Sequence, residues 1–543
     1  MKRAGFYIRL ILFICFFFLL MGLVGSAGVL EGAEDLPPQE TLTAPAQTSK
    51  EASEEMPATL EPLAGEEMPA TLEPLAGEEL PATLEPLAGE EMKELPKDGE
   101  VPEKLAKPLG DELATEEEGG LFRELADNAL YSVKTWGTAF PSSFPKGNIA
   151  DDADLKFMTR LAMESNTMIN ERLAFQMELL GTYSTGEDEL RGTFGKPGST
   201  ARKGRILEAR RAFLRLEEDD YDVVIGKALV PVGLSNLFIP SNRYELADAA
   251  EPTRVETMGV WQINVNYYIE DDKLSYTFMP YHERSSSPDG LSRWLGSSGD
   301  PTFFSLPSTV TTTSPGGGTQ APEERFWSIG DVKSWGHLLH YKGVRSGYDF
   351  FALAHFGPSA YPVVKDENSK FFKENPLALT VAGGVSATVE AWNLYSEASY
   401  QLTNDNKDQD FLKYVLGASY RETKFAGKIG LEEIFPILEY AGEVLTDVQK
   451  KNDYVVDSQE ARPGHNTLLF KIDFRQNDDF TYQFFWTRNL TTIDEMLGGM
   501  VEYRYDDSLT FQLIGTNFTG QDNTQFGRWN DNDYIQLQVH YKF

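Results

Sequence analysis

The last nine residues of the chain, 535–543, alternate without exception between apolar and polar side chains. The apolar positions are Ile535, Leu537, Val539, Tyr541 and Phe543, and Gln, His or Lys occupies the positions between them. Because successive side chains of a β-strand point to opposite faces, this period of two predicts a strand with one apolar and one polar face. Such a strand fits a barrel whose outer face meets lipid or the sandwich of a soluble protein. The recurrence of the pattern along the chain favours the barrel.

The N-terminus has the pattern of a secretory signal. Basic residues within the first nine positions precede an apolar segment at 10–20 and a small-residue cleavage site at 25–27, so we predict removal of residues 1–27. The only cysteine, Cys15, lies in this segment. The mature chain would therefore hold no thiol, which excludes disulfides and cysteine-based metal or catalytic sites.

Residues 28–120 are predicted to be a disordered acidic arm. Residues 54–89 hold three copies of a twelve-residue unit, Glu-Glu-Met/Leu-Pro-Ala-Thr-Leu-Glu-Pro-Leu-Ala-Gly, whose two prolines prevent a continuous helix. Residues 31–120 carry a net charge of −20, against −35 for the whole chain, which argues against nucleic-acid binding. The arm could tether the protein to a periplasmic partner or to peptidoglycan, or it could be a duplicated spacer.

From about residue 129 onward, β-type segments recur between alternately short and long connections. No stretch outside the signal is apolar over about eighteen residues, so helical membrane spans are not expected. The predicted strands are 129–140, 155–164, 171–184, 205–217, 221–230, 257–269, 273–283, 334–344, 347–357, 377–389, 392–402, 410–421, 424–435, 466–474, 479–490, 495–505, 507–518 and 531–543. We therefore predict an all-β fold for residues 121–543. It would be a transmembrane antiparallel β-barrel of about 18 strands (16–18), in the outer membrane of a Gram-negative cell, with the arm in the periplasm.

The closing strand ends on an aromatic residue and so resembles that of bacterial outer-membrane barrels, which implies that Phe543 is part of an assembly signal. Residues 205–294 resemble the porin-like barrels of the alginate-export family. The motifs are Leu207–Leu216, Val224–Lys227, Pro240-Ser241-Asn242-Arg243, Met279-Pro280-Tyr281 and Ser292-Arg293-Trp294. Residues 226–234, with Arg254 and Gly259 downstream, are also similar to the phosphate-selective porins. These resemblances imply a large barrel that passes solutes.

Seven basic residues are candidates for lining the pore and setting its selectivity. Strand parity directs Arg211, Arg215 and Lys227 inward, where Arg254 could complete a positive wall that favours anions. The candidates on the other strands are Lys471, Arg475 and Arg504, which oppose apolar outward positions. The alternative is that inward cations pair with inward carboxylates, as in any water-filled barrel.

The longest predicted connection, 284–333, is either a constriction or plug inside the lumen or a mobile surface loop. The pair His337 and His340 cannot chelate zinc together, because residues three apart on a strand face opposite sides. We expect no catalytic site, cofactor or metal.

The predicted function is an outer-membrane porin for diffusion or export of hydrophilic solutes, anionic ones included, through a water-filled lumen. The alternative is a non-conducting structural or adhesive barrel that its long loop plugs. The expected partners are outer-membrane lipid and either small solutes or a polysaccharide. A homotrimer is compatible with the sequence.

Overall fold

The fold is described from a computed structural model of the 543-residue chain. The described residues are 128–141, 153–185, 207–242, 244, 246–249, 251–285, 292–295, 310–311, 319–320, 323–324, 330–450, 453–459 and 462–543. Contacts within the chain separate residues 1–80 from residues 81–543, and every described residue belongs to the second unit. The predicted signal peptide, 1–27, and the predicted arm, 28–120, lie outside the described residues.

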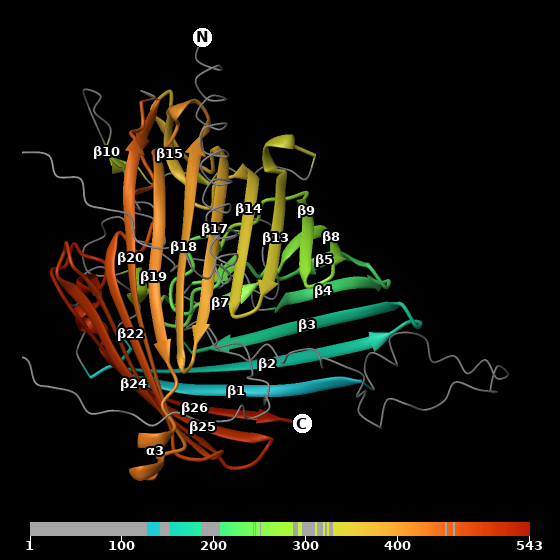
Figure 1. Ribbon diagram of the computed structural model, residues 1–543. Helices are drawn as coiled ribbons and strands as arrows, with labels where there is room; N and C mark the ends of the chain where they lie inside the picture. Colours follow the sequence, from blue (N-terminus) through green and yellow to red (C-terminus); the bar gives the residue numbers. More distant parts are fainter. Residues whose placement is uncertain are drawn as a thin grey trace, which may run out of the picture. The chain divides into compact units, whose positions relative to one another are not determined.

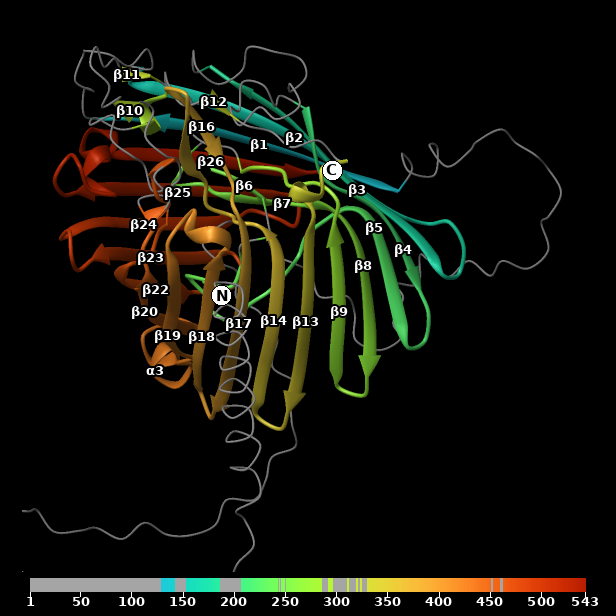
Figure 2. The same cartoon turned by 90° about the horizontal axis from the view of Figure 1, so that it is seen from above.

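Eighteen antiparallel strands form one closed sheet, which confirms the predicted barrel (Figures 1 and 2). Each strand pairs with the barrel strands before and after it in the chain, and the first strand pairs with the last. In order around the barrel the strands are β1 (Ala129–Ala139), β2 (Leu155–Met168), β3 (Leu173–Ser184), β4 (Leu207–Glu217), β5 (Tyr221–Ala228), β8 (Val260–Ile269), β9 (Asp272–Met279), β13 (Gly336–Arg345), β14 (Tyr348–Pro358), β17 (Leu377–Val389), β18 (Trp392–Thr403), β19 (Asp410–Tyr420), β20 (Glu433–Asp447), β22 (Asn466–Arg475), β23 (Phe480–Asn489), β24 (Asp494–Arg504), β25 (Leu509–Thr519) and β26 (Tyr534–Lys542).

The C-terminal strand closes the barrel against β1. The pairing runs antiparallel from Ser132 opposite Lys542 to Ala139 opposite Ile535. Beyond it, the Tyr131 N–H donates to the Phe543 carbonyl (3.1 Å), and the Phe543 N–H donates to the Tyr131 carbonyl (2.8 Å). The predicted faces are confirmed, because Ile535 is 56% exposed on the outside whereas Gln536 is 6% exposed on the inside.

The outward face of the barrel is apolar on neighbouring strands as well. Leu394 on β18, Leu416 on β19 and Leu438 on β20 are each about half exposed. The inward residues beside them on β18 and β20, Glu397 and Glu439, are buried. This reverses the pattern of a water-soluble protein, in which exposed side chains are mostly polar. The apolar outer band is therefore suited to an apolar surrounding.

The two rims of the barrel differ in their connections. Seven connections at one rim span only two to four residues, and they are 169–172, 218–220, 270–271, 346–347, 390–391, 476–479 and 505–508. Ala129 at the start of β1 and the C-terminal Phe543 lie at this short-turn rim. The longest connections, 229–259 and 280–335, lie at the opposite, long-loop rim.

The predicted strand at 424–435 is wrong. Residues 424–428 form the helix α3 (Lys424–Lys428), and the strand in that part of the chain is β20, which extends into the predicted loop 436–465. The inward positions Phe435 and Ile437 of β20 are apolar like its outward positions, and both are buried. The period of two that identifies the other strands is therefore absent here.

Smaller elements lie in the long connections. They are β6 (Leu246–Asp248), β7 (Glu256–Met258), β10 (Val310–Thr311), β11 (Thr319–Gln320), β12 (Glu323–Glu324), β15 (Val363–Glu367), β16 (Lys370–Glu374), β21 (Tyr454–Val456), and the 3-10 helices η2 (Arg293–Leu295), η3 (Val332–Ser334), η4 (Asn404–Asn406) and η6 (Gly527–Asn532). Strands β12, β16, β15 and β21 form a separate four-stranded sheet. Among the described residues, no helix is long and apolar enough to cross a bilayer.

Candidate functional site

The connection 229–259, between β5 and β8, folds into the barrel. Its first part contacts β18 and β20, which lie six and eight strands from β5 around the barrel. Since the barrel has 18 strands, these contacts are on the far side of the lumen. The sequence predicted either a segment inside the lumen or a surface loop at 284–333, most of which lies outside the described residues, and it gave no sign that 229–259 folds inward.

Glu397 on β18 holds the loop through four short hydrogen bonds. Its carboxylate accepts from the Leu234 N–H (2.9 Å), the Ser235 hydroxyl (2.8 Å), and both the N–H (2.9 Å) and the hydroxyl (2.5 Å) of Ser241. Gly233, which starts this turn, has a φ of +96°, and a Cβ there would lie 2.2 Å from the Ile239 side chain. The turn therefore requires glycine.

Glu439 on β20 binds the next residues of the same loop. Its carboxylate accepts from three consecutive backbone N–H groups, those of Asn236 (2.8 Å), Leu237 (2.9 Å) and Phe238 (2.8 Å), and from the Tyr395 hydroxyl (2.7 Å). Glu439 is 0% exposed. Successive N–H groups that point at one anion form a nest, which compensates the carboxylate for lost hydration. We call residues 233–241 with Glu397 and Glu439 the loop anchor.

A second buried ionic cluster lies next to the loop anchor. Arg462, which is 0% exposed, donates to Glu443 through Nη2 (2.7 Å) and Nε (3.0 Å), and it lies 4.1 Å from the centre of the Phe411 ring. The Lys413 Nζ lies 3.4 Å from Glu443 Oε2, the oxygen that also accepts from Arg462 Nε. Burial raises the pKa of Asp408, which lies in the connection between β18 and β19. Arg462 and nearby hydrogen bonds offset part of this increase.

The second part of this connection, residues 246–249 and 251–258, is here called the return limb. It packs on the opposite wall, β2 to β4. Arg160 forms ion pairs with Asp248 (3.5 Å) and with Glu256. Arg210 donates through Nε to the Thr257 carbonyl (2.9 Å). Arg210 is the extra residue of a β-bulge, which is why the adjacent Arg210 and Arg211 can both reach Glu178.

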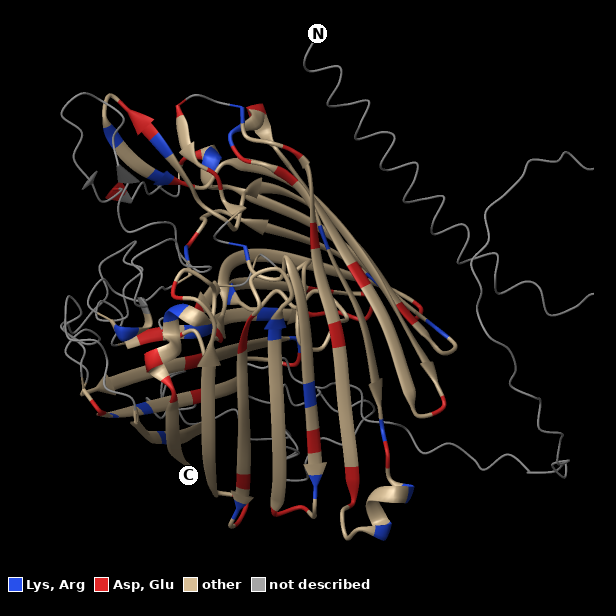
Figure 3. Cartoon of the chain, turned by 90° about the vertical axis from the view of Figure 1, so that its left-hand side faces the viewer, with Lys and Arg blue, Asp and Glu red and all other residues tan. Residues whose placement is uncertain are grey.

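Each of the four basic residues predicted for the positive wall has a carboxylate partner. The pairs are Arg211 with Glu164 (3.1 Å) and Glu178 (2.8 Å), Arg215 with Glu217 (3.0 Å) and Asp222 (3.2 Å), Lys227 with Glu208 and Glu283 (3.7 Å each), and Arg254 with Glu251 (2.5 Å). The arrangement therefore follows the alternative in which inward cations pair with inward carboxylates. Figure 3 shows acidic and basic residues interspersed along the strands.

The other three predicted residues lie on β22 and β24, apart from this group. Lys471 pairs with Asp473 (3.2 Å), and Arg475 pairs with Glu432 (3.1 Å). Arg504 is exposed at the short-turn rim and forms no ion pair within 4 Å among the described residues. The structure does not bring these three together with Arg211.

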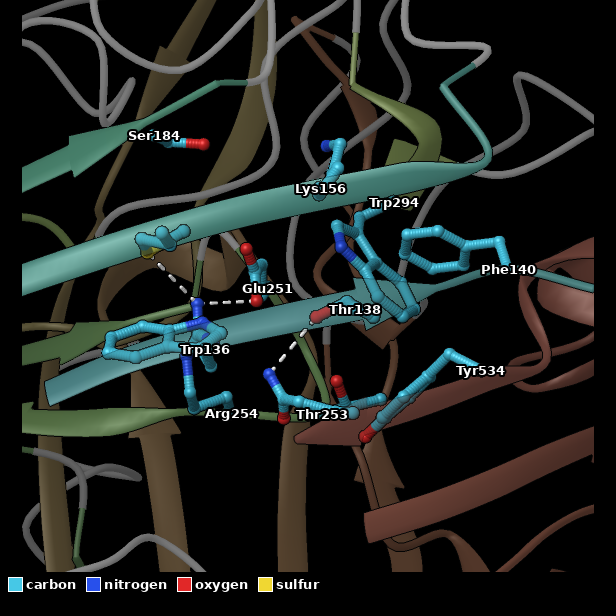
Figure 4. Close-up of a pocket in the computed structure, with 12 residues that line it drawn as sticks. Trp136, Thr138, Phe140, Lys156, Ser184, Glu251, Thr253, Arg254, Trp294 and Tyr534 are labelled. Carbon is cyan, nitrogen blue, oxygen red and sulfur yellow. Dashed lines mark hydrogen bonds and ion pairs between the residues drawn. The ribbon is translucent and has the colours of Figure 1, made fainter. Parts of the chain in front are cut away.

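A small pocket lies between the return limb and the seam of β26, β1 and β2 (Figure 4). Its volume is about 10 Å³, room for about one water molecule. Two of the residues that line the pocket are in contact, since the Arg254 guanidinium lies 4.1 Å from the centre of the Trp136 ring. Trp294, which is 2% exposed, packs here against Phe140 and Tyr534. The described residues 292–295 of the connection 284–333 therefore also lie against the inner wall.

The interior of the barrel differs between its two halves. From the middle of the barrel to the long-loop rim, inward residues such as Lys413, Val415 and Glu439 are 0% exposed. Near the short-turn rim, the side chains of Glu164 and Arg475 are 55% and 52% exposed. We call these the closed half and the open half. Among the described residues, no three His, Cys, Asp or Glu side chains are grouped as metal ligands would be.

The sequence carries no local sign that Glu397, Glu439, Glu443 and Arg462 are functional residues. The anchoring contacts of Glu439 join residues about 200 positions apart. A local pattern has no signal for such contacts.

No protein-family model matches the chain, and no curated protein matches it. The resemblance to the alginate-export and phosphate-selective families is therefore unsupported. Solved structures with a similar fold include a BenF-like porin from Pseudomonas fluorescens Pf-5, at 7% identity and a TM-score of 0.41, over 77% of this chain and 98% of that one. Acinetobacter baumannii OccAB4 has 10% identity and a TM-score of 0.42, over 77% and 98%. Pseudomonas aeruginosa OccK3 (OpdO) has 8% identity and a TM-score of 0.43, over 78% and 97%. At these values the likeness assigns neither a family nor a solute to the chain.

Proposed function

We propose that the protein is an outer-membrane channel through which small hydrophilic solutes diffuse, with the connection 229–259 as its constriction. The observation that carries this proposal is the loop anchor. Two buried carboxylates hold a polar loop across a closed barrel whose outer face is apolar. A loop fixed across the lumen sets the size of what can pass, and the charges around it set the preference.

The constriction favours small solutes over a polysaccharide. The anchored loop is bound at both walls of the lumen, at Glu397 and Glu439 on one side and at Arg160 and Arg210 on the other. A polymer would have to displace these contacts, whereas small solutes need only pass beside them. The paired charges at Arg211 and Arg215 also favour weak rather than strong ion selectivity.

The test is the single-channel conductance of the refolded mature protein in a planar bilayer, with a salt gradient to give the reversal potential. The proposal expects discrete conductance steps with a weak ion preference. Correctly folded barrels that conduct nothing would replace it with the structural or adhesive barrel. The buried inward residues at mid-barrel, such as Val415 and Glu439 at 0% exposed, are the observation that favours that second candidate.

The remaining parts of the proposal concern assembly and topology. The signal 1–27 is cleaved, and the acidic residues 28–120 are in the periplasm. Phe543 acts in assembly, where its ring stacks on Tyr131 with centroids 5.9 Å apart. Phe543→Ala should therefore lower the yield of heat-modifiable barrel in the outer membrane, whereas the matched variant Phe511→Ala on β25 should not. A homotrimer and a peptidoglycan partner of the arm stay predictions of the sequence.

A further inference from the structure

We propose that the connection 421–432, here called the α3 hook, anchors the short-turn rim in the headgroup region of an anionic phospholipid leaflet. The inference rests on the proposed membrane location of the barrel but not on its channel activity. It concerns a part of the molecule remote from the loop anchor.

The α3 hook is the exception among the connections of its rim. It spans twelve residues where the seven short turns span two to four. Its shape is fixed by hydrogen bonds, because the Glu422 carboxylate accepts from the Phe425 N–H (2.6 Å) and the Leu431 N–H donates to the Ala426 carbonyl (3.0 Å). Glu422 also forms an isolated bridge with Ile434 of β20. A connection built this way presents a defined surface.

That surface combines two apolar and two cationic side chains. Phe425 and Ile429 are each 54% exposed and lie four residues apart, which places them on one side of the turn. Lys424 and Lys428 have the same spacing, and neither forms an ion pair within 4 Å among the described residues. Figure 3 shows basic residues at both ends of this short helix beyond the strand ends. Aromatic and aliphatic groups with adjacent lysines match the boundary between acyl chains and anionic headgroups.

The outward apolar face of the barrel continues into the α3 hook. Leu416 is 54% exposed on β19, and Tyr420 at the end of that strand packs against Trp392 with ring centroids 4.7 Å apart. Aromatic pairs of this kind mark the level of the membrane interface. Phe425 follows five residues after Tyr420. The α3 hook therefore contacts the same lipid that covers the outer face of the strands, at the level of the headgroups.

The test uses the absence of cysteine outside the predicted signal peptide. Ile429→Cys in the mature protein carries an environment-sensitive fluorophore, and the barrel is refolded into vesicles of phosphatidylcholine with or without phosphatidylglycerol. The matched control is Ser346→Cys, an exposed position in the turn 346–347 of the same rim. We expect spin-labelled lipid to quench the probe at 429 several-fold more than the probe at 346, and aqueous iodide to do the reverse. Equal quenching by iodide at both positions would overturn the proposal.

Two further variants separate the alternatives. Lys424→Gln combined with Lys428→Gln should remove the dependence of probe burial on phosphatidylglycerol, and unchanged dependence would overturn the cationic part of the proposal. A chain that starts at residue 128 tests whether the acidic arm covers the hook instead, because the probe would then become accessible to iodide. Heat-modifiable migration confirms folding in each sample. A folded barrel with a lipid-buried probe and no conductance would keep this inference and reject the channel.

Discussion

The closed half and the open half of the barrel interior place similar ion pairs in different surroundings. In the closed half, Glu443 binds Arg462, whose side chain is 0% exposed. In the open half, Arg475 pairs with Glu432 while its side chain is 52% exposed. Removing one partner of a buried pair leaves an uncompensated charge, whereas water replaces the missing partner of an exposed pair. The same chemical interaction therefore fixes loops in one half and contributes little to stability in the other.

Releasing the loop from its anchor should open the closed half. We predict that Glu397→Gln combined with Glu439→Gln raises the single-channel conductance several-fold and increases its noise. Each charge-assisted hydrogen bond contributes about 1.5–3 kcal/mol, and the amide cannot accept at both of its heavy atoms. Glu164→Gln, an exposed inward carboxylate of the open half, is the control. A double variant with the conductance of the wild type would contradict the role of the loop anchor.

Removal of one cation from each half compares how much the ion pairs of the two halves contribute to the free energy of unfolding. Arg462→Gln should lower the free energy of unfolding by about 3–5 kcal/mol, because Glu443 would remain buried without its main partner. Arg475→Gln should lower it by about 0–1 kcal/mol, as for a surface pair. Urea titration of the barrel refolded in lipid vesicles measures both. Similar losses for the two variants would show that the closed half is hydrated in solution.

A substitution at a glycine tests the turn of the loop anchor without a change of charge. We predict that Gly233→Ala destabilises the anchored conformation of the loop by about 1–3 kcal/mol. Alanine is strained at positive φ, and its Cβ would overlap Ile239. Gly515→Ala is the matched control, because a Cβ at Gly515 has no heavy atom within 4 Å. Protease cleavage within 233–241 should increase for the first variant only. Equal protection of both variants would argue against a strained turn.

The smallest expected effect concerns selectivity. Arg211→Gln should shift the reversal potential modestly toward cations, because Glu164 and Glu178 lose one counter-charge and keep their own. Arg504→Gln, at the rim of the open half, should shift it less. A loss of all conductance for Arg211→Gln in a folded barrel would instead indicate that Arg211 supports the loop structurally.

The strands could be predicted because the outer face of the barrel is apolar and the inner face polar, so that alternation appears in the sequence. Alternation failed at β20, where Phe435 and Ile437 are apolar on the inner face as well. Parity also directed Arg211 inward, but the position of Arg210 beside it depends on a bulge that no residue type marks. The loop anchor could not be predicted, because its contacts depend on the path of a loop across the whole lumen.

The pairing of β1 with β26 also has a consequence for how the sheet is formed. Every other barrel pair joins consecutive barrel strands, whereas this one brings together residues 398 positions apart, as in the contact of Gln536 with Thr138. Local hairpins can form as the chain emerges, but this contact has the largest loop-closure entropy and needs both the first and the last strand of the barrel. We therefore expect it to form last. Until then the sheet has two unpaired edges, which an assembly factor or an adjacent chain can pair with.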